Sequence, residues 1–330
     1  MKKAKRPLDL YLLVLSLVCI VTVALRTVAL FTEWNNLSMH FDDELLITIE
    51  NLLDLLGVLF FISYFVVVRE EEKLIASSDT PLTYVPSGMV SVALLFLSVE
   101  TISNGALAYV SSNIALKILT PIIFIFGIIS ALSFFLSIFI EKNVSTYKAI
   151  FSMALVIFLA LFSAYLYFDK HMHPTNSPVK IVDLLAYLFA AIFFLYESRI
   201  NLGRPLWRPY TVFGLTAALL TAYSSIPTII YYAVSKEFVS DSVYACVLTL
   251  TISLFIGARV FLARSFAKEE ICDTVKCIEA LATKREEEMA KGDVVLTGEN
   301  ATTSEEYEAS DYENFTMDIP MPDFSAEEEN

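Results

Sequence analysis

The chain is poor in the residues that soluble proteins place at their surfaces and turns. Charged residues make up 18% of its 330 residues, against about 25% in typical soluble domains, and there are only nine glycines. The hydrophobic fraction is 56%, above the usual value of about 45–50%. This balance disfavours a soluble globular protein and indicates a protein that lies largely within a membrane.

Residues that bind metals or drive catalysis are also scarce. The four cysteines show no disulfide framework, and Cys272 and Cys277 lack the further ligands of a zinc site. Motifs of metalloproteases, serine hydrolases, P-loop proteins and dinucleotide-binding enzymes are missing. We therefore predict a non-enzymatic protein with no metal site, no cofactor and no nucleic-acid partner.

Long apolar segments dominate the remainder of the chain. Each of eight segments holds 22 to 27 residues, and about 20 suffice for a helix to cross the bilayer. They predict an all-α polytopic membrane bundle over residues 1–267, with spans at 9–31, 45–68, 87–110, 114–140, 147–168, 178–200, 210–235 and 239–265. The first span is too long for a signal-peptide core, so we expect an uncleaved helix.

Basic residues are distributed unequally between the two ends of these spans. Fourteen lysines and arginines lie at one set of ends, whereas the opposite set has four, namely Lys117, Lys170, Lys180 and Lys236. Because cytoplasmic loops carry an excess of lysine and arginine, the distribution predicts that both termini are cytoplasmic. The expected location is the bacterial cytoplasmic membrane, with the lipid bilayer as a partner.

One cytoplasmic connection, "YESRINLGRPLWRPY" at 196–210, is rich in arginine and aromatic residues. Its side chains either anchor the topology or contact lipid or a cytosolic partner. The candidates for such contact are Arg199, Arg204, Trp207 and Arg208. Together with the eight-span pattern, this loop resembles uncharacterised multi-pass membrane proteins of bacterial genomes. The resemblance implies no activity, substrate or site.

An internal duplication is suggested by a shift of 129 residues. This shift places "DLLGVLFF" at 54–61 over "DLLAYLFA" at 183–190 and so aligns Asp54 with Asp183. Leucine-rich helices also match one another by chance, so a four-plus-four repeat and a coincidence both remain open.

Six polar residues interrupt the outer halves of the spans, and ionisable groups at that depth usually face a bundle interior. They are Arg26, Glu50, Asp54, Glu100, Asn104 and Asp183. Glu50 and Asp54 are four residues apart and share a helix face, as do Glu100 and Asn104. These side chains either hold helices together as ion pairs or form an acidic cavity for a small cationic ligand from outside.

The chain beyond residue 267 differs from the bundle in composition. Residues 268–290 have the apolar spacing of a short amphipathic cytoplasmic helix. Of the 37 acidic residues, 15 lie in 286–330. We therefore expect 291–330 to be a disordered acidic tail, either solvated or bound to a cytosolic protein.

Two functions fit these features. The first is a membrane sensor or scaffold whose cytoplasmic output passes through the C-terminal helix and tail. The second is a transporter or channel for a small cation, an amine or a proton-coupled solute that uses the outer carboxylates. Glycine is scarce and few prolines break the spans, whereas transporters often have discontinuous helices. The first function is therefore preferred.

Overall fold

The computed structural model describes residues 7–35, 38, 40–42, 45–67, 81–108, 114–139, 146–168, 177–201, 206–237, 239 and 242–266. Within these ranges the structure is helical apart from one antiparallel pair of two-residue strands, β1 (Trp34–Asn35) and β2 (His40–Phe41). The sequence did not predict this β-hairpin. The expected amphipathic helix at 268–290 and the tail at 291–330 lie outside the described residues.

Eight long helices and one short helix, α3, follow the order of the predicted spans. They are α1 (Pro7–Thr32), α2 (Leu45–Ile62), α3 (Tyr64–Val67), α4 (Pro81–Ala108), α5 (Ile114–Phe139), α6 (Thr146–Phe168), α7 (Pro178–Asn201), α8 (Trp207–Ser235) and α9 (Val243–Phe266). Seven helical segments, one of which joins α2 and α3, are long and apolar enough to cross a membrane. In α6 the corresponding described segment, Ser152–Phe168, is shorter. The predicted all-helical class is confirmed.

Five helices begin at other residues than predicted, three of them by three or more residues, and local chemistry explains two of these three larger differences. In α8, which begins at Trp207, Pro209 occupies the first turn, where its missing N–H has no helical partner to lose. In α9, the Ser242 hydroxyl accepts the backbone N–H groups of Tyr244 at 3.1 Å and Ala245 at 3.2 Å, so Ser242 caps the helix. The third, α4, begins before Pro86 and includes it.

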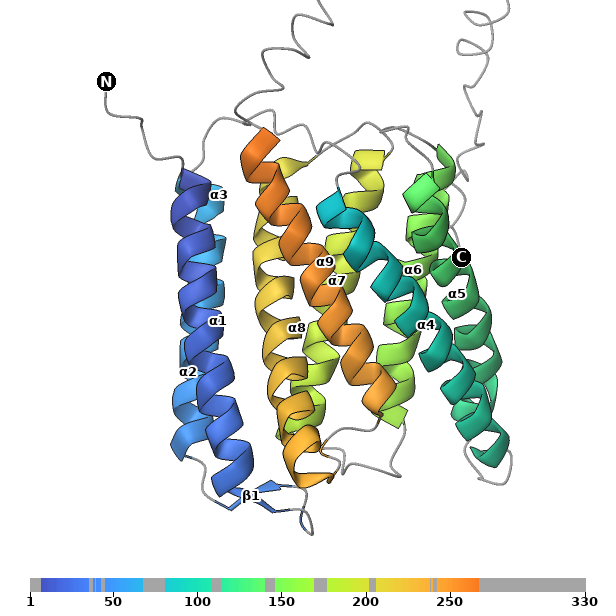
Figure 1. Cartoon of the computed structure of the whole chain (residues 1–330), viewed down its shortest axis with the longest axis horizontal. Coiled ribbons are helices and arrows are strands. Elements are labelled where there is room, and N and C mark those ends of the chain that lie inside the picture. Colours follow the sequence, from blue (N-terminus) through green and yellow to red (C-terminus); the bar gives the residue numbers. More distant parts are fainter. Residues whose placement is uncertain are drawn as a thin grey trace, which may run out of the picture. The chain divides into compact units, whose positions relative to one another are not determined.

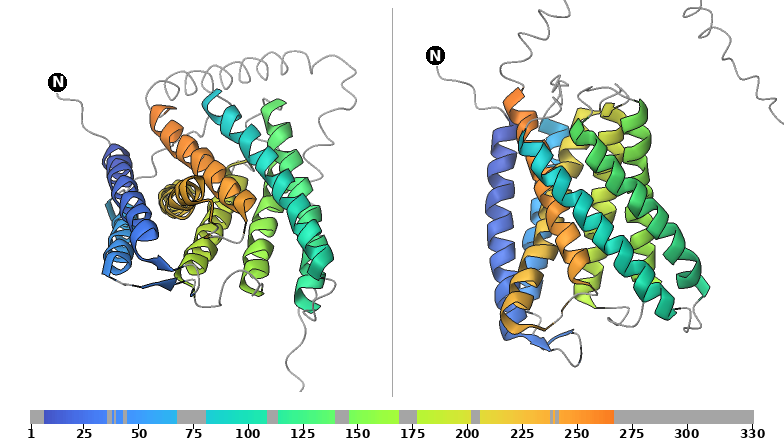
Figure 2. Two further views of the ribbon diagram at one scale, coloured as in Figure 1. Left: turned by 60° about the horizontal axis from the view of Figure 1, so that its bottom comes forward. Right: turned by 45° about the vertical axis from the view of Figure 1, so that its right-hand side comes forward.

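Helices α4 to α9 form a closed ring. Each packs against the next along the chain, and α9 closes the ring against α4. The pair α1 and α2 lies outside this ring and packs mainly on α8, as Figures 1 and 2 show. The N-terminal hairpin of helices is thus an addition to a six-helix body.

Aromatic side chains fill the middle of the ring. Phe134 of α5, Phe194 of α7 and Phe255 of α9 form a three-ring cluster with centroid separations of 5.3 to 5.8 Å. Nearby, the Tyr187 hydroxyl donates a hydrogen bond to the backbone carbonyl of Ala245 at 3.2 Å. The body is therefore a packed core.

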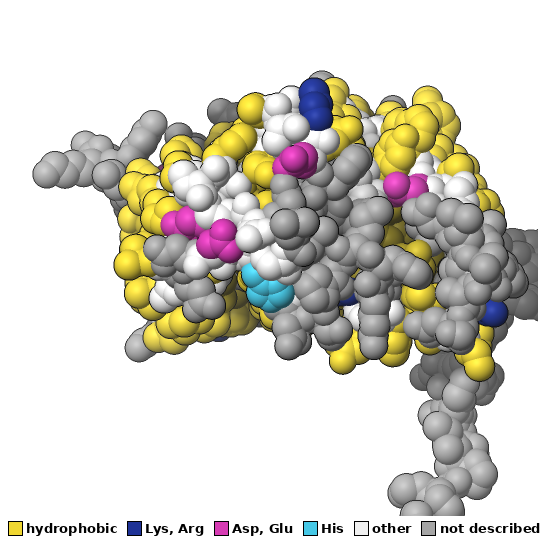
Figure 3. All heavy atoms as spheres, turned by 90° about the horizontal axis from the view of Figure 1, so that it is seen from below, with side chains coloured by type: hydrophobic (Ala, Val, Ile, Leu, Met, Phe, Trp, Pro, Cys, Tyr) yellow, Lys and Arg dark blue, Asp and Glu magenta, His cyan; other side chains and the backbone are white. Residues whose placement is uncertain are grey.

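The outside of the helices is apolar. Large aliphatic and aromatic side chains are exposed along α1, α2, α4 and α5. Figure 3, which looks at the end that carries the β-hairpin, shows hydrophobic side chains around the margin and acidic ones nearer the middle. Such an exterior matches a lipid environment better than water.

Helix packing does not repeat between the two halves of the chain. A four-plus-four duplication would relate α2 and α4 to α7 and α8. Helices α7 and α8 pack along each other, whereas the described residues of α2 make their contacts with α1, α3 and α8. The arrangement gives the duplication no support.

Candidate functional site

A buried ion pair joins the two N-terminal helices. Arg26 of α1 donates from Nη1 to Glu50 Oε1 of α2 at 3.0 Å, and the two residues are 4% and 0% exposed. The hydroxyl of Tyr223, in α8, donates to the same carboxylate oxygen. Since Tyr223 belongs to the six-helix ring, this triad fastens the N-terminal hairpin to the body.

Two more carboxylates lie around Arg26. Asp54, one turn after Glu50, is buried and hydrogen-bonds to the side chain of Thr22. Asp183 of α7 accepts a hydrogen bond from the Ser224 hydroxyl. Arg26 interacts electrostatically with Glu50, Asp183 and Asp54. We call this group the Arg26 cluster; its members are Thr22, Arg26, Glu50, Asp54, Asp183, Tyr223 and Ser224.

Sequence spacing accounts for part of this convergence. Thr22 and Arg26 are four residues apart in α1, as are Glu50 and Asp54 in α2, so each pair shares a helix face. Gly57 continues the face of α2, and a Cβ atom there would lie 3.2 Å from Val18 of α1. Glycine thus lets the two backbones approach closely.

The β-hairpin covers the Arg26 cluster at one end. The Phe41 ring centroid lies 5.0 Å from Cζ of Arg26, and the Tyr223 centroid lies 5.3 Å away. Aromatic faces attract a guanidinium at such distances. Phe41 also belongs to a buried apolar group with Ala29, Leu30, Ile47, Val179, Tyr231 and Val239. The polar cluster therefore lies beneath an apolar cover.

The cluster holds more negative than positive groups. Among the described residues, Arg26 is the positive group that acts on both Glu50 and Asp54. Glu50 Oε2 and Asp54 Oδ1 are buried and have no hydrogen-bond partner in the described structure. Buried carboxylate oxygens without partners are unfavourable, so these two atoms are the positions of the cluster that can accept a further hydrogen bond or bind an ion.

A second buried ion pair occupies the opposite end of the helices. Arg259 of α9 pairs with Glu197 of α7, and both hydrogen-bond to the side chain of Tyr210 in the first turn of α8. The Tyr210 ring centroid lies 5.9 Å from that of Trp207. We call Glu197, Tyr210 and Arg259 the Arg259 cluster. This cluster was not predicted from the sequence, because Glu197 and Arg259 both lie near helix ends, where charged side chains are expected.

The two clusters have the same construction. Each has an arginine–glutamate pair supplied by two neighbouring helices, and a tyrosine of α8 bonded to the glutamate. Tyr210 and Tyr223 are 13 residues apart, or about 20 Å along a helix.

A proline interrupts the backbone hydrogen bonds of α8 next to the Arg26 cluster. Pro227 follows Tyr223 by four residues and has no N–H to donate to the Tyr223 carbonyl. Helix α8 thus connects both clusters and is weakened beside one of them.

The remaining predicted site residues lie elsewhere. Glu100 accepts a hydrogen bond from Ser242 at the start of α9 and is not among the charges that act on Arg26. Asn104 is in α4, but its side chain lies outside the described residues. The structure thus brings together Arg26, Glu50, Asp54 and Asp183, and leaves Glu100 apart.

The arginine-rich connection is described in part. Arg199 is exposed and Arg208 is half-buried, whereas Arg204 lies outside the described residues. Trp207 is only 8% exposed and belongs to the main core. Trp207 therefore offers little surface to a lipid or partner, and Arg199 is the most accessible of the described members of this predicted contact.

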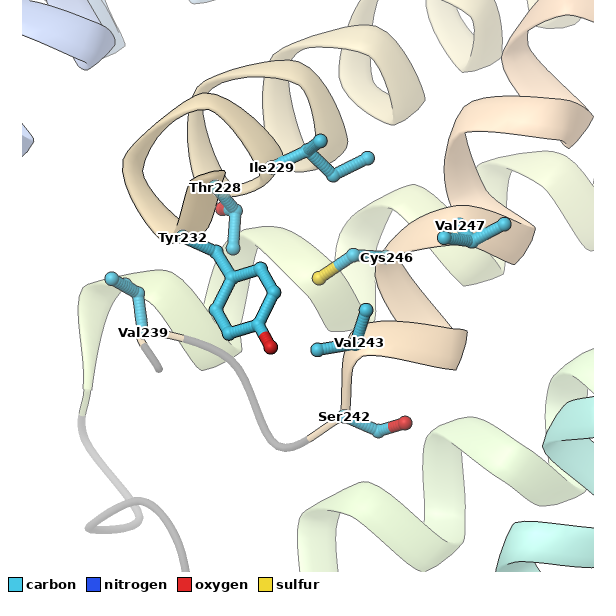
Figure 4. Close-up of a pocket in the computed structure, with 8 residues that line it drawn as sticks. All are labelled: Thr228, Ile229, Tyr232, Val239, Ser242, Val243, Cys246 and Val247. Atoms are coloured by element: carbon cyan, nitrogen blue, oxygen red, sulfur yellow. The ribbon is translucent and has the colours of Figure 1, made fainter. Parts of the chain in front are cut away.

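A small pocket opens between the end of α8 and the start of α9, at the same end as the β-hairpin. Its volume is about 60 Å³, less than half of the roughly 150 Å³ that accommodates benzene in an engineered core. Figure 4 shows the Cys246 sulfur pointing towards the Tyr232 ring, with Val239 and Val243 nearby. The pocket has room for a few methylene groups.

Within the described part of the chain, no three histidine, cysteine or acidic residues are placed to hold a metal ion together. The Arg26 cluster contributes two carboxylates on one helix face and a nearby threonine hydroxyl.

Scanning the chain against protein-family models gave no match, nor did searches of curated proteins and of solved structures.

Proposed function

We propose that this chain is a non-enzymatic multi-pass membrane sensor whose input is the Arg26 cluster and whose output leaves through the C-terminal segment. The observation that carries the proposal is the paired construction at the two ends of α8. Tyr223 binds the glutamate of one buried ion pair, and Tyr210 binds the glutamate of the other. A displacement of α8 at one pair therefore bears on the other.

The physical basis is a stiff helix held at both ends. Most of α8 is buried between α1, α7 and α9, so it moves only with its neighbours. Because Pro227 removes one backbone hydrogen bond, bending is easiest next to Tyr223. A change of charge among Glu50, Asp54 and Asp183 would alter the electrostatic attraction on Arg26 and the hydrogen bond of Tyr223. The resulting displacement of α8 would move Tyr210.

The output route follows from the position of Arg259. This residue lies seven positions before the end of α9, and the chain beyond α9 is the predicted amphipathic helix and acidic tail. Movement of Tyr210 relative to Glu197 and Arg259 would thus displace the end of α9 and the chain that follows it, which we propose binds a cytosolic partner. Arg199, in the neighbouring connection, offers a second contact for that partner or for anionic lipid.

The chain's two tryptophans allow a direct test. Trp34 lies in β1, and Trp207 packs beside Tyr210. In a Trp34→Phe background, we expect Glu50→Gln to change the emission of Trp207, because the Arg26 cluster is coupled to it through α8. Glu100→Gln is the matched control, since Glu100 is an acidic residue outside the cluster.

Adding Tyr223→Phe should reduce the effect of Glu50→Gln on Trp207 emission, because that change removes the hydroxyl link while keeping the ring. The sensor proposal fails if Trp207 emission is the same in the parent and in Glu50→Gln. It also fails if Glu100→Gln changes the emission as much as Glu50→Gln does.

The proposed location is the bacterial cytoplasmic membrane, with both termini and the Arg259 cluster facing the cytoplasm. In a cysteine-free background, His40→Cys and Met172→Cys should react with a membrane-impermeant thiol reagent in intact cells. Leu206→Cys and Asn300→Cys should react only after lysis. Labelling of position 300 from outside would contradict this orientation.

A second candidate function is transport of a small cation. Two buried carboxylate oxygens without hydrogen-bond partners favour it, since they could hold a passing cation. The aromatic filling of the ring argues against a path through its middle. Uptake of radioactive sodium or methylamine by proteoliposomes separates the two functions, since a sensor gives no uptake above empty vesicles and a transporter loses its uptake in Asp54→Asn.

A further inference from the structure

We propose that the Arg26 cluster binds a monovalent metal cation of the size of sodium at Glu50 and Asp54. This inference rests on the proposed sensor function for its biological meaning, because the ion would be the ligand that is sensed. The binding site itself stands on the geometry of the cluster.

Negative charge exceeds positive charge in and around the Arg26 cluster of the described structure. Glu50, Asp54 and Asp183 all act on the single guanidinium of Arg26, and Glu33 acts on Glu50 as well. Helix α7 also buries Lys180, one turn before Asp183. Among the described residues, and even with Lys180 counted, these four acidic groups outnumber two basic ones. A surplus of negative charge in a low-dielectric interior is unfavourable until a cation neutralises it.

Two buried carboxylate oxygens of the cluster have no hydrogen-bond partner in the described structure. Arg26 and Tyr223 both bind Glu50 Oε1, which leaves Oε2 without a partner. Asp54 Oδ1 is likewise buried without one. The two residues are one turn apart on the same face of α2, and the Thr22 side chain adds a polar group beside Asp54. Carboxylate and hydroxyl oxygens are the ligands that hard cations prefer.

The donor set favours a monovalent ion. Divalent calcium usually takes six to eight oxygens, and transition metals favour nitrogen and sulfur ligands. In the described residues no trio of histidine, cysteine or acidic side chains is assembled for either. Two carboxylates and a hydroxyl next to an arginine suit a singly charged ion, which feels less repulsion from the guanidinium.

Cation binding should change the fluorescence of Trp34, which lies in β1 of the β-hairpin. Phe41 lies over the Arg26 guanidinium, and its ring centroid is 5.1 Å from that of Trp34. A cation at Glu50 and Asp54 would weaken their attraction for Arg26, and a shift of Arg26 would disturb Phe41. In a Trp207→Phe variant, Trp34 is the single tryptophan and reports on this contact.

The experiment uses the full chain in lipid nanodiscs at constant ionic strength, with sodium chloride exchanged for choline chloride. Sodium should raise the Tm saturably and change Trp34 emission over the same concentration range. Asp54→Asn, which keeps the shape and removes one charge, should raise the apparent Kd at least about tenfold. Glu100→Gln, which changes an acidic residue outside both clusters, should leave the sodium dependence intact.

Equal Tm values and equal Trp34 emission in sodium and choline would overturn the proposal. So would a sodium effect that survives unchanged in Asp54→Asn, because the ion would then bind elsewhere. Stabilisation that follows acidification and is the same in both salts would mean that the carboxyls take up protons instead. If sodium changes Trp34 emission in the Trp207→Phe variant but leaves Trp207 emission unchanged in the Trp34→Phe variant, the site exists and the sensor function fails.

Discussion

The buried Arg26–Glu50 pair can be tested by a double-mutant cycle. Arg26→Met leaves Glu50, Asp54 and Asp183 without the guanidinium on which all three act. Removing one partner of a buried ion pair costs about 3–5 kcal/mol, and three carboxylates place this variant at the upper end. Glu50→Gln should cost less, about 1–3 kcal/mol, because Asp54 and Asp183 still balance Arg26.

The double variant decides whether the two residues are coupled. Replacing both removes one charge of each sign, so its loss should be smaller than the sum of the two single losses by about 2 kcal/mol. The free energy of unfolding can be measured by circular dichroism in mixed micelles with an increasing fraction of denaturing detergent. The matched control combines Arg26→Met with Glu100→Gln, whose losses should add because Glu100 lies outside both clusters.

Additivity of Arg26→Met and Glu50→Gln within about 0.5 kcal/mol would refute the reasoning. It would mean that the 3.0 Å contact between Arg26 and Glu50 contributes nothing specific to stability. A Glu50→Gln loss larger than that of Arg26→Met would refute the charge argument in another way, because Arg26 would then lack effective acidic neighbours other than Glu50.

Four further predictions concern backbone packing and the tail. Gly214→Ala should lower the free energy of unfolding by about 1–3 kcal/mol, because its Cβ would lie 2.7 Å from Cγ2 of Val260. Gly257→Ala has no atom within 4 Å and should leave stability unchanged or slightly raised. Pro227→Ala should restore a backbone hydrogen bond in α8 and weaken the fluorescence response between the clusters. Deleting 291–330 should leave membrane insertion and Tm unchanged, and a truncated chain that fails to fold would contradict the predicted independence of the tail.

Much of the helical architecture is predictable from the sequence because length and lack of charge largely decide it. A long segment with almost no charge has few alternatives to a helix that crosses a membrane. Helix starts depend on individual side chains and were less predictable. The start of α9 is fixed by the Ser242 cap, a signal that was present in the sequence. The β-hairpin was missed because two-residue strands show no periodicity.

The candidate site was predictable only as a set of residues. Arg26, Glu50, Asp54 and Asp183 stand out because ionisable groups within apolar segments are rare. Which of them meet depends on helix packing, and Glu100 had the same sequence signature yet lies beside α9. Arg259 was overlooked because near a helix end a basic residue is expected as a topological signal. Its partner Glu197 was the signal that could have indicated a buried pair.

The placement of the N-terminal hairpin outside the ring has a consequence for biogenesis. Helices α1 and α2 leave the ribosome before α8, because Tyr223 and Ser224, the α8 members of the Arg26 cluster, follow Asp54 by 169 residues or more. At about 5–20 residues per second, this interval lasts roughly 10–30 seconds. If the helices insert into the membrane as proposed, the Arg26–Glu50 pair between α1 and α2 can form during this interval and lower the cost of placing both charges in lipid. A chain with only one of these two charges should therefore be a substrate for membrane quality control before α8 is synthesised.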